Sequence, residues 1–360
     1  MKYTLNDIFI VPAVVSDIDS RSQCNPLYEN GLLPLFTAPM SSVVGIDNYG
    51  TFLENKIKSI IPRNEDLASR LNLCKKTWCA FSLSEFIENF VNARFYDMDT
   101  VLYYNGHMFV LIDIANGHMK KMHDAIRKAK QIYGDKIVIM AGNIANPETY
   151  VELSEAGADY VRVGIGTGSV CITSSNTGIH YPIASLITEC YEKSLGLYKP
   201  ALIVADGGCR GYSDIIKCLA LGADYVMCGS IFSKMLESHG PVYLKCDNEY
   251  TELKKEHVTF SNGKPNVLCN EVNPPASIVK KYYGMSTRKA QREINGEDSK
   301  TSEGIEKEIT VDYSISQWVE NFIDYLKSSM SYTNSKTLEN FIGKVNTIIV
   351  SNNSSGSINK

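Results

Sequence analysis

The stretch from Gly164 to Thr173 has the residue types and spacing best suited to chemistry, with the sequence GIGTGSVCIT. Its three alternate glycines allow backbone groups to approach an anion or a metal ion closely. They also place Cys171 on an exposed loop, where a thiol acts as a nucleophile if its pKa falls below the free value of about 8.5. A surface turn followed by a packed cysteine fits the same pattern, so the residues alone leave both interpretations open.

A second polar group follows the apolar run 201–205. Asp206 precedes Gly207 and Gly208, which combines a carboxylate suited to vicinal hydroxyls with glycine amides suited to a phosphate. Gly229 and Ser230 repeat this small, polar pattern after the next apolar run. Because an Asp-Gly-Gly turn is common in loops, this motif alone is more often structural than functional.

The other polar candidates have ordinary surroundings. Glu303 lies in the polar segment NGEDSKTSEG, and Arg21, Arg63 and Lys300 are isolated cations of the kind that usually face solvent. The six histidines form no HxxxH spacing and the ten cysteines form no CxxC pair. A structural zinc site and a disulfide scaffold are therefore not expected, and most of the thiols should be small buried side chains.

The elements that must position these groups follow a βα rhythm. Short β-branched runs without alternation recur, each followed by a polar turn and a segment with helical periodicity, as in parallel strands buried on both faces. Eight such units favour an α/β fold of the TIM (β/α)8 barrel type, with the polar residues on its C-terminal face. The expected strands are 35–38, 59–62, 78–81, 109–114, 136–140, 160–163, 201–205 and 225–228, and the clearest helices are 119–133, 147–156, 183–193 and 212–221.

Composition limits the class of protein. The chain has 360 residues, of which 44% are hydrophobic and 21% charged, as in a soluble globular protein. Its net charge of −4 argues against nucleic acid as a partner. The N-terminus is too polar for a signal peptide, and no apolar stretch approaches the roughly 18 residues of a membrane span, so we expect a cytoplasmic protein without membrane contact.

Taken together, these segments resemble the family of IMP dehydrogenase and GMP reductase. Their order and spacing cover nearly the whole chain, and the glycine–cysteine loop is the most specific of them. The segments that carry the resemblance are IDIANGH (112–118), AGN (141–143), GADYVRVGIGTGSVCIT (157–173), ADGGCR (205–210), GADYVMCGS (222–230), YYGMS (282–286), SEG (302–304) and SSMSY (328–332).

The resemblance implies a TIM barrel that acts on a purine ribonucleotide. A covalent bond would form between Cys171 and purine C2, Thr173 and Glu303 would serve proton transfer, and a nicotinamide cofactor would exchange hydride at that carbon. The substrate contacts would be Ser169, Asp206, Gly207, Gly208, Gly229, Ser230, Gly284, Met285, Ser286 and Gly304. The cofactor contacts would be Ser20, Arg21, Arg63, Asp113, Ile114, Ala115, Ser328 and Ser331, and the carbonyls of Gly166, Gly168 and Cys171 would hold a monovalent cation such as K⁺.

The resemblance also favours one branch of the family. Dehydrogenases carry a regulatory module inserted early in the barrel, and the segment 62–76 leaves no room for one. They also use an Arg-Tyr pair on a flap, and no such pair precedes Glu303. We therefore expect one catalytic domain over residues 1–350, with a flap or excursion at about 240–305 and a disordered tail at 351–360. Within the excursion, Gly240–Lys281 shows no strong periodicity, and a helix is expected at 317–326 after it.

The resulting prediction is NADPH-dependent reductive deamination of GMP to IMP and ammonia, by a homo-oligomer that the resemblance makes a tetramer. Departures from the family keep alternatives open: Thr167 replaces a proline, Ser174 a basic residue, Arg63 a lysine, and Ser299-Lys300 a Tyr-Arg pair. The alternatives are an NAD-dependent IMP dehydrogenase that forms XMP, an enzyme for a related or modified purine nucleotide, and a nucleotide-binding pseudo-enzyme.

Overall fold

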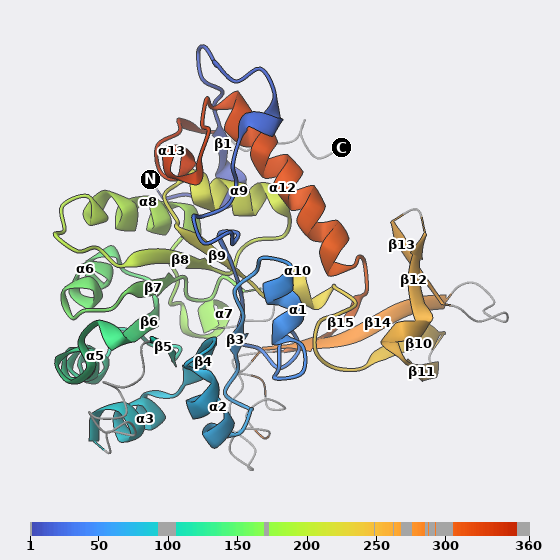
Figure 1. Ribbon diagram of the computed structural model, residues 1–360, viewed down its shortest axis with the longest axis horizontal. Helices are drawn as coiled ribbons and strands as arrows, with labels where there is room; N and C mark the ends of the chain where they lie inside the picture. The colour runs from blue at the N-terminus through green and yellow to red at the C-terminus, as the bar shows by residue number, and fades with distance from the viewer. Residues whose placement is uncertain are drawn as a thin grey trace.

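A ring of eight parallel strands wrapped by helices forms the centre of the molecule (Figure 1). The computed structural model describes residues 2–92, 106–168, 173–247, 249–261, 263–267, 276–284, 287, 292 and 305–350. The strands of the ring are β2 (Leu35–Thr37), β3 (Ile60–Ile61), β4 (Trp78–Phe81), β5 (Met108–Asp113), β6 (Ile137–Ile144), β7 (Tyr160–Val163), β8 (Leu202–Asp206) and β9 (Tyr225–Cys228).

The hydrogen-bonded order of these strands is β2-β9-β8-β7-β6-β5-β4-β3. A parallel bridge between Phe36 and Lys58 closes the ring, where the Thr37 amide donates to the Lys58 carbonyl at 2.9 Å. All eight strands expected from the sequence are therefore present, and the TIM barrel is confirmed.

Helices cover the outside of the barrel because each has one apolar stripe. In α5, for example, Met122, Ala125, Ile126 and Ala129 are buried at helical spacing. The helices of the described chain are α1 (Tyr49–Glu54), α2 (Leu67–Leu73), α3 (Leu83–Phe86), η3 (Ile87–Asn92), α5 (Lys120–Tyr133), α6 (Pro147–Glu155), α7 (Thr173–Thr177), α8 (Ile183–Ser194), α9 (Tyr212–Ala220), α10 (Ser230–Ser233), α12 (Ile315–Tyr332) and α13 (Leu338–Phe341), with short turns η1 (Leu5–Asp7), η2 (Arg21–Gln23), η4 (Gly134–Lys136) and η5 (Lys255–His257).

Helix α12 is longer than the expected segment 317–326. It begins at Ile315, because Ser314 accepts a hydrogen bond from the Gln317 amide and forms a capping box with Gln317. It continues to Tyr332, and its buried face extends past Leu326 to Met330. The polar run of serines near its end concealed this last part of the helix from the sequence pattern.

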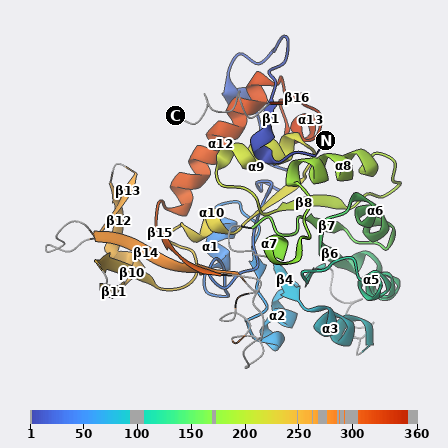
Figure 2. The same cartoon turned by 180° about the vertical axis from the view of Figure 1, so that it is seen from behind.

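The excursion after the barrel is an antiparallel sheet that projects to one side (Figures 1 and 2). Its order is β11-β10-β14-β15, and a separate hairpin pairs β12 with β13. A small core of its own includes Val242, Val258, Ile278 and Val311. Its strands are β10 (Val242–Cys246), β11 (Glu249–Leu253), β12 (Val258–Ser261), β13 (Lys264–Val267), β14 (Ala276–Tyr283) and β15 (Glu306–Thr310).

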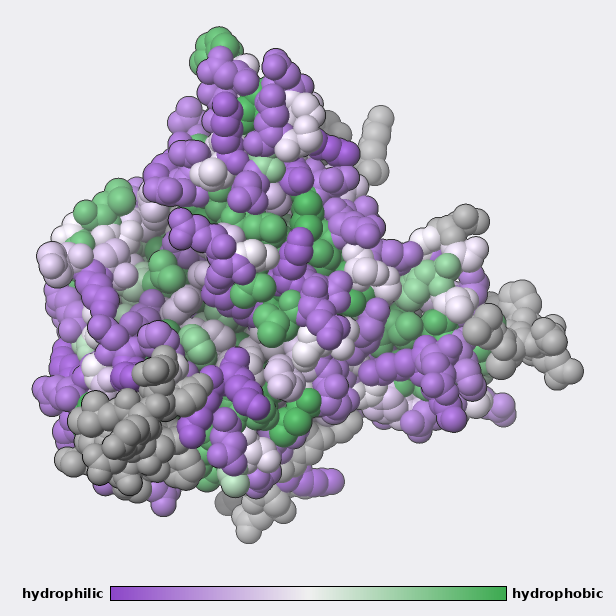
Figure 3. Space-filling model, in the orientation of Figure 1, coloured by the Kyte–Doolittle hydropathy of each residue, from purple (hydrophilic) through white to green (hydrophobic). Residues whose placement is uncertain are grey.

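Two strands near the ends of the described chain pair beside the barrel. Strand β1 (Ile8–Ile10) pairs antiparallel with β16 (Thr347–Ile349) next to α12 and α13 (Figure 2). Hydrophilic side chains cover much of the face in Figure 3, with apolar patches between them. Within the described ranges, no helix combines the length and the apolar character needed to cross a membrane.

Candidate functional site

A cavity of about 580 Å³ opens at the C-terminal ends of the barrel strands. Loops after β2, β3, β5, β7, β8 and β9 line it, together with Asn143 near the end of β6 and the end of β14. Because a TIM barrel gathers its functional side chains at this face, the cavity is the candidate site. The residues predicted from the sequence that line it are Arg63, Asp113, Ile114, Ala115, Gly166, Gly168, Asp206, Gly207, Gly208, Gly229, Ser230 and Gly284.

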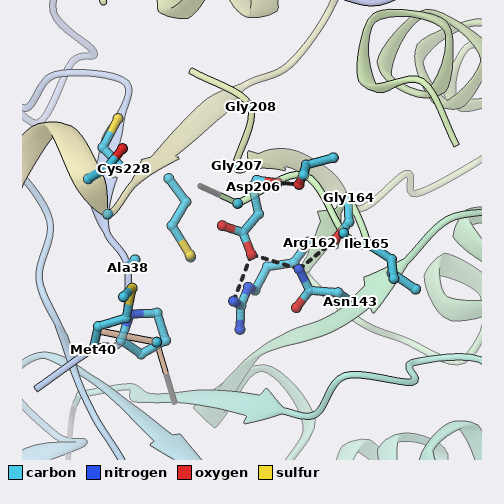
Figure 4. Close-up of a pocket in the computed structure, with 18 of the residues that line it drawn as sticks. Ala38, Met40, Asn143, Arg162, Gly164, Ile165, Asp206, Gly207, Gly208 and Cys228 are labelled. Carbon is cyan, nitrogen blue, oxygen red and sulfur yellow. Dashed lines mark hydrogen bonds and ion pairs between the residues drawn. The ribbon is translucent and has the colours of Figure 1, made fainter. Parts of the chain in front are cut away.

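A buried charge network lies in the wall of this cavity (Figure 4). Arg162, which is 6% exposed, donates from Nη1 to Asp113 Oδ1 at 2.6 Å and from Nη2 to Asp206 Oδ2 at 2.8 Å. Asn143 Nδ2 donates to the same Asp206 oxygen at 2.6 Å and to the Gly164 carbonyl at 2.8 Å. Burial by itself lowers the pKa of Arg162, but the two carboxylates outweigh it and raise that pKa above its ordinary value.

This network fixes the carboxylate of Asp206. Its Oδ2 atom accepts from both Arg162 and Asn143, so the side chain is held in one orientation at the end of β8. The other carboxylate oxygen receives no hydrogen bond from the described residues, which leaves it free to accept from a ligand. Sequence reasoning did not include Arg162 or Asn143 among the site residues. The signal was a lone arginine inside the buried strand YVRV, since a buried charge requires a partner.

Glycines bring the loops after β7 and β8 into direct contact. A Cβ atom on Gly164, whose φ is +133°, would lie 2.4 Å from the Asp206 carbonyl oxygen, and one on Gly207 would lie 2.5 Å from Thr167 Oγ1. The Thr167 hydroxyl donates to the Asp206 carbonyl at 2.7 Å. Thr167 therefore links the glycine–cysteine loop to the Asp206 loop.

Four backbone N–H groups at one side of the cavity are available to a ligand. They belong to Gly207 and Gly208 after β8 and to Gly229 and Ser230 after β9, and within the part of the chain that the structure describes they donate to no protein acceptor. Such groups bind anionic oxygens well, since each supplies a fixed donor with little side-chain bulk. The arrangement therefore suits a phosphate.

A second set of predicted residues lies apart from the cavity. Ser20 caps the turn η2, in which Arg21 Nη2 lies 3.1 Å from Asp324 Oδ2 on α12. Ser328 and Ser331 are in the last turns of α12, where the Ser331 hydroxyl donates to the Ser328 carbonyl at 2.8 Å. The structure thus places these four residues at η2 and on α12, two elements in contact with each other, outside the lining of this chain's cavity.

Several predicted residues lie outside the described ones, namely Ser169, Cys171, Met285, Ser286, Glu303 and Gly304. Thr173 is the first residue of α7, and its side chain is not described. Gly168, the last described residue before Ser169, and Gly284, the last before Met285, both line the cavity.

The described cysteines differ from the expected properties of a nucleophile. Of the eight, seven are buried and Cys246 is exposed on β10. Cys209 and Cys228 line the cavity, but the contact with Cys218 and burial raise the pKa of Cys209, and burial raises that of Cys228. Their thiols therefore stay protonated at neutral pH. Among the described residues, no group of three or more His, Cys, Asp and Glu side chains is placed to hold a metal ion.

The fold and the site together define a TIM-barrel protein with a polar cavity at the carboxyl ends of its strands. Comparison with known proteins makes this more specific. The model of the family described as "IMP dehydrogenase / GMP reductase domain" matches residues 91–256. Over these residues the chain is similar to this family, and the relatives described next extend that similarity.

Three relatives show how the similarity is distributed. The chain is 34% identical over 245 residues to the GMP reductase of Buchnera aphidicola subsp. Baizongia pistaciae, an alignment that covers 68% of this chain and 61% of the relative. It is 32% identical over 235 residues to the GMP reductase of Caenorhabditis elegans, covering 64% and 56%. It is 28% identical over 375 residues to the GMP reductase of Buchnera aphidicola subsp. Schizaphis graminum, covering 98% and 95%. The first two alignments thus span less than two thirds of those relatives.

Proposed function

We propose that this protein is a GMP reductase that catalyses the reaction GMP + NADPH + 2H⁺ → IMP + NADP⁺ + NH₄⁺. In this proposal residues 1–350 act as one catalytic domain without an inserted regulatory module, and residues 240–305 form its excursion. The relatives to which it is similar are named GMP reductase, and the cavity has the groups that a ribonucleotide monophosphate requires.

The observation that carries the proposal is the juxtaposition of Asp206 with the free amides. The Asp206 carboxylate is held by Arg162 and Asn143 with one oxygen available, and the amides of Gly207 and Gly208 follow directly in the chain. A carboxylate accepts hydrogen bonds from the 2′ and 3′ hydroxyls of a ribose, while the amides donate to its 5′-phosphate. The site thus holds the two polar parts of a nucleotide and leaves the base free to reach into the cavity.

We assign the chemical step to Cys171, Thr173 and Glu303, and Cys171 lies close in the sequence to a residue that lines the cavity. Cys171 comes three residues after Gly168, which lines the cavity, and its thiolate would add to purine C2. Glu303 and Thr173 would deliver the proton with which the C2 amino group leaves as ammonia. IMP is released when the bond between the cysteine sulfur and C2 breaks, which returns the thiolate.

The cofactor side of the cavity is assigned to Arg63, Asp113, Ile114 and Ala115. Arg63 Nη1 lies 3.4 Å from the Asp113 carbonyl, and its Nε atom is buried without a hydrogen-bond partner among the described residues, which suits a bound polar group. When bound, NADPH supplies the hydride that replaces the amino group at C2.

Three further assignments complete the proposal. The carbonyls of Gly166, Gly168 and Cys171 would hold K⁺. Gly166 already accepts from the Ser174 hydroxyl at 3.3 Å, and its second lone pair remains for a cation. Ser20, Arg21, Ser328 and Ser331 lie away from this chain's cavity, so a neighbouring copy in a homotetramer would bring them to the cofactor. The described cysteines form no disulfide, which fits a cytoplasmic protein.

Two coupled assays test the function on the full-length purified protein. With GMP and NADPH, we expect loss of NADPH absorbance with stoichiometric IMP and ammonia, detected by chromatography and an ammonia assay. With IMP and NAD, we expect little or no XMP. XMP formation with GMP inert would establish the dehydrogenase alternative. Tight GMP binding without turnover of either nucleotide would establish the pseudo-enzyme, and turnover of another purine nucleotide in preference to GMP would change the substrate.

A further inference from the structure

Some of the charged side chains that line the cavity form ion pairs, and others do not. Three arginines (Arg63, Arg162 and Arg210) and two aspartates (Asp113 and Asp206) are among its described lining residues. Arg162 forms ion pairs with both aspartates, at 2.6 and 2.8 Å. Arg63 and Arg210 form none within the described chain. The cavity therefore presents two guanidinium groups that pair with no carboxylate of the described residues.

These two arginines occupy different sides of the barrel mouth. Arg63 follows β3 and lies beside the Asp113 carbonyl. Arg210 follows β8, and β2 and β9 stand between β3 and β8 in the closed ring. A single small anion therefore does not bind both, so each arginine marks its own anionic group.

Arg210 is closest in the chain to the free amides. It comes two residues after Gly208, in the loop that leads into α9. Its backbone N–H donates to Asp214 Oδ2 at 2.8 Å, which holds this loop at the start of the helix. Its side chain is exposed, and in the described part of the chain no hydrogen bond or ion pair is assigned to it.

We propose that Arg210 binds the 5′-phosphate of the nucleotide together with the amides of Gly207, Gly208, Gly229 and Ser230, and that it sets the preference for a phosphorylated substrate. The amides donate hydrogen bonds but carry no net charge, whereas a phosphate monoester carries nearly two negative charges at pH 7. A guanidinium adds a balancing charge and two parallel donors. This inference rests on the proposed function, because it takes the ligand to be a nucleoside monophosphate.

Calorimetric titration of the full chain with GMP and with guanosine tests this directly, since binding is measured without turnover. For Arg210→Met we expect the Kd of GMP to rise about 10- to 150-fold while the Kd of guanosine stays within about twofold of wild type. For Arg210→Lys the Kd of GMP should lie between those of wild type and Arg210→Met, because lysine keeps the charge but loses the forked donor geometry. Arg63→Met is the matched control, since it removes the other unpaired guanidinium and should leave the ratio of the GMP and guanosine affinities unchanged.

The pH dependence of the affinity for GMP gives a second test of the role of Arg210. Between about pH 5 and 7 the phosphate loses its second proton, so GMP affinity should increase with pH in wild type and increase less in Arg210→Met. Equal GMP affinity in wild type and Arg210→Met, or an equal loss for guanosine, would overturn the assignment of Arg210 while leaving the proposed function intact. Failure of wild type to bind GMP at all would instead overturn the proposed function, and this inference with it.

Discussion

The two ends of the barrel are built from the same strands, but one end is filled by aromatic side chains and the other exposes polar groups. At the N-terminal end, Phe36, Trp78, Tyr160 and Tyr225 fill the interior, with ring centroids 5.0 to 6.1 Å apart in the pairs that touch. Lys58 lies over this cluster, and its Nζ atom donates to Tyr225 Oη at 2.8 Å. At the C-terminal end, glycines replace large side chains, and among the described residues four backbone amides have no protein acceptor and two guanidinium groups, those of Arg63 and Arg210, form no ion pair.

The comparison shows how one strand serves both ends. Strand β7 begins with Tyr160 in the aromatic cluster, carries Arg162 into the charge network, and ends next to Gly164 at the cavity. Closely packed aromatic rings at one end stabilise the barrel, since they bury large apolar areas. The open end can then bind a ligand without destabilising the ring. Substitutions at the two ends should accordingly change different properties.

The largest effect should come from removing the proposed nucleophile. Cys171→Ala should lower turnover of GMP by more than about 10⁴-fold while GMP binding stays largely intact, because the thiolate is needed for the covalent step and not for holding the phosphate or ribose. Steady-state assays and calorimetry measure the two quantities. Cys246→Ala, which changes an exposed cysteine on β10, should have no effect on either. Activity retained in the Cys171 variant would exclude the covalent mechanism.

Glu303→Gln should have the next largest effect. Loss of a positioned general acid should reduce the rate of IMP formation by about 10²–10⁴-fold, since ammonia leaves poorly without a proton. The measurement is kcat with GMP and NADPH across pH. An unchanged kcat would show that another group delivers the proton.

Arg162→Met separates stability from binding at the open end. It would leave Asp113 and Asp206 as partly buried carboxylates without their partner, and it should lower the free energy of unfolding by about 3–5 kcal/mol and raise the KM for GMP. Arg70→Met is the matched control, because Arg70 is also buried and pairs with Glu85 at 2.8 Å, away from the cavity. Denaturant unfolding should show losses in both variants, but KM should change only for Arg162.

Asp206 should distinguish ribose from deoxyribose. A carboxylate that accepts from both hydroxyls loses one charge-assisted hydrogen bond with dGMP, worth roughly 1.5–3 kcal/mol. The ratio of kcat/KM for GMP to that for dGMP should therefore be about tenfold or more. Equal values would show that Asp206 does not contact the ribose.

The smallest effect on activity should come from the closed end. Burial lowers the pKa of Lys58 to about 8, while an unfolded lysine has a pKa of about 10.4. Between these two pH values the unfolded chain binds the proton and the native one does not, so the free energy of unfolding rises with pH, by up to about 3 kcal/mol before solvent screening. Urea unfolding at about pH 7.5 and 10 measures the free energy of unfolding, which should rise between these pH values in wild type. In Lys58→Met this rise should be absent. Turnover of GMP should be the same in both proteins, and a loss of turnover would contradict the separation of the two ends.

The sequence indicated the barrel well because its strands are buried on both faces. The run FVLIDI is apolar except for Asp113, and YVMC is apolar apart from the tyrosine hydroxyl, so both could be recognised locally as strands of a parallel sheet. Asp206, Gly207 and Gly208 could be recognised in the same way, because they follow such a run directly. Their position in the cavity is then fixed by the barrel itself.

Other features depended on contacts that the sequence does not show. The edge strand β11, with the sequence EYTEL, is exposed at four of its five positions, so it has no apolar alternation that would identify it. The role of Arg162 required knowledge that β5 and β8 carry aspartates toward β7 from either side. The separation of Ser20, Arg21, Ser328 and Ser331 from the cavity follows from the pairing of η2 with α12, which no local pattern predicts.

The pairing of strands also determines when the barrel can close during translation. Leu35 in β2 pairs with Val226 in β9, and Ile8 in β1 pairs with Ile349 in β16. The first strand of the barrel therefore has no partner on that side until the last barrel strand has left the ribosome, and β1 waits for nearly the whole chain. Strand β1 and one edge of β2 therefore emerge early and gain these partners late, whereas β3 and β4 can pair with each other as soon as both have emerged.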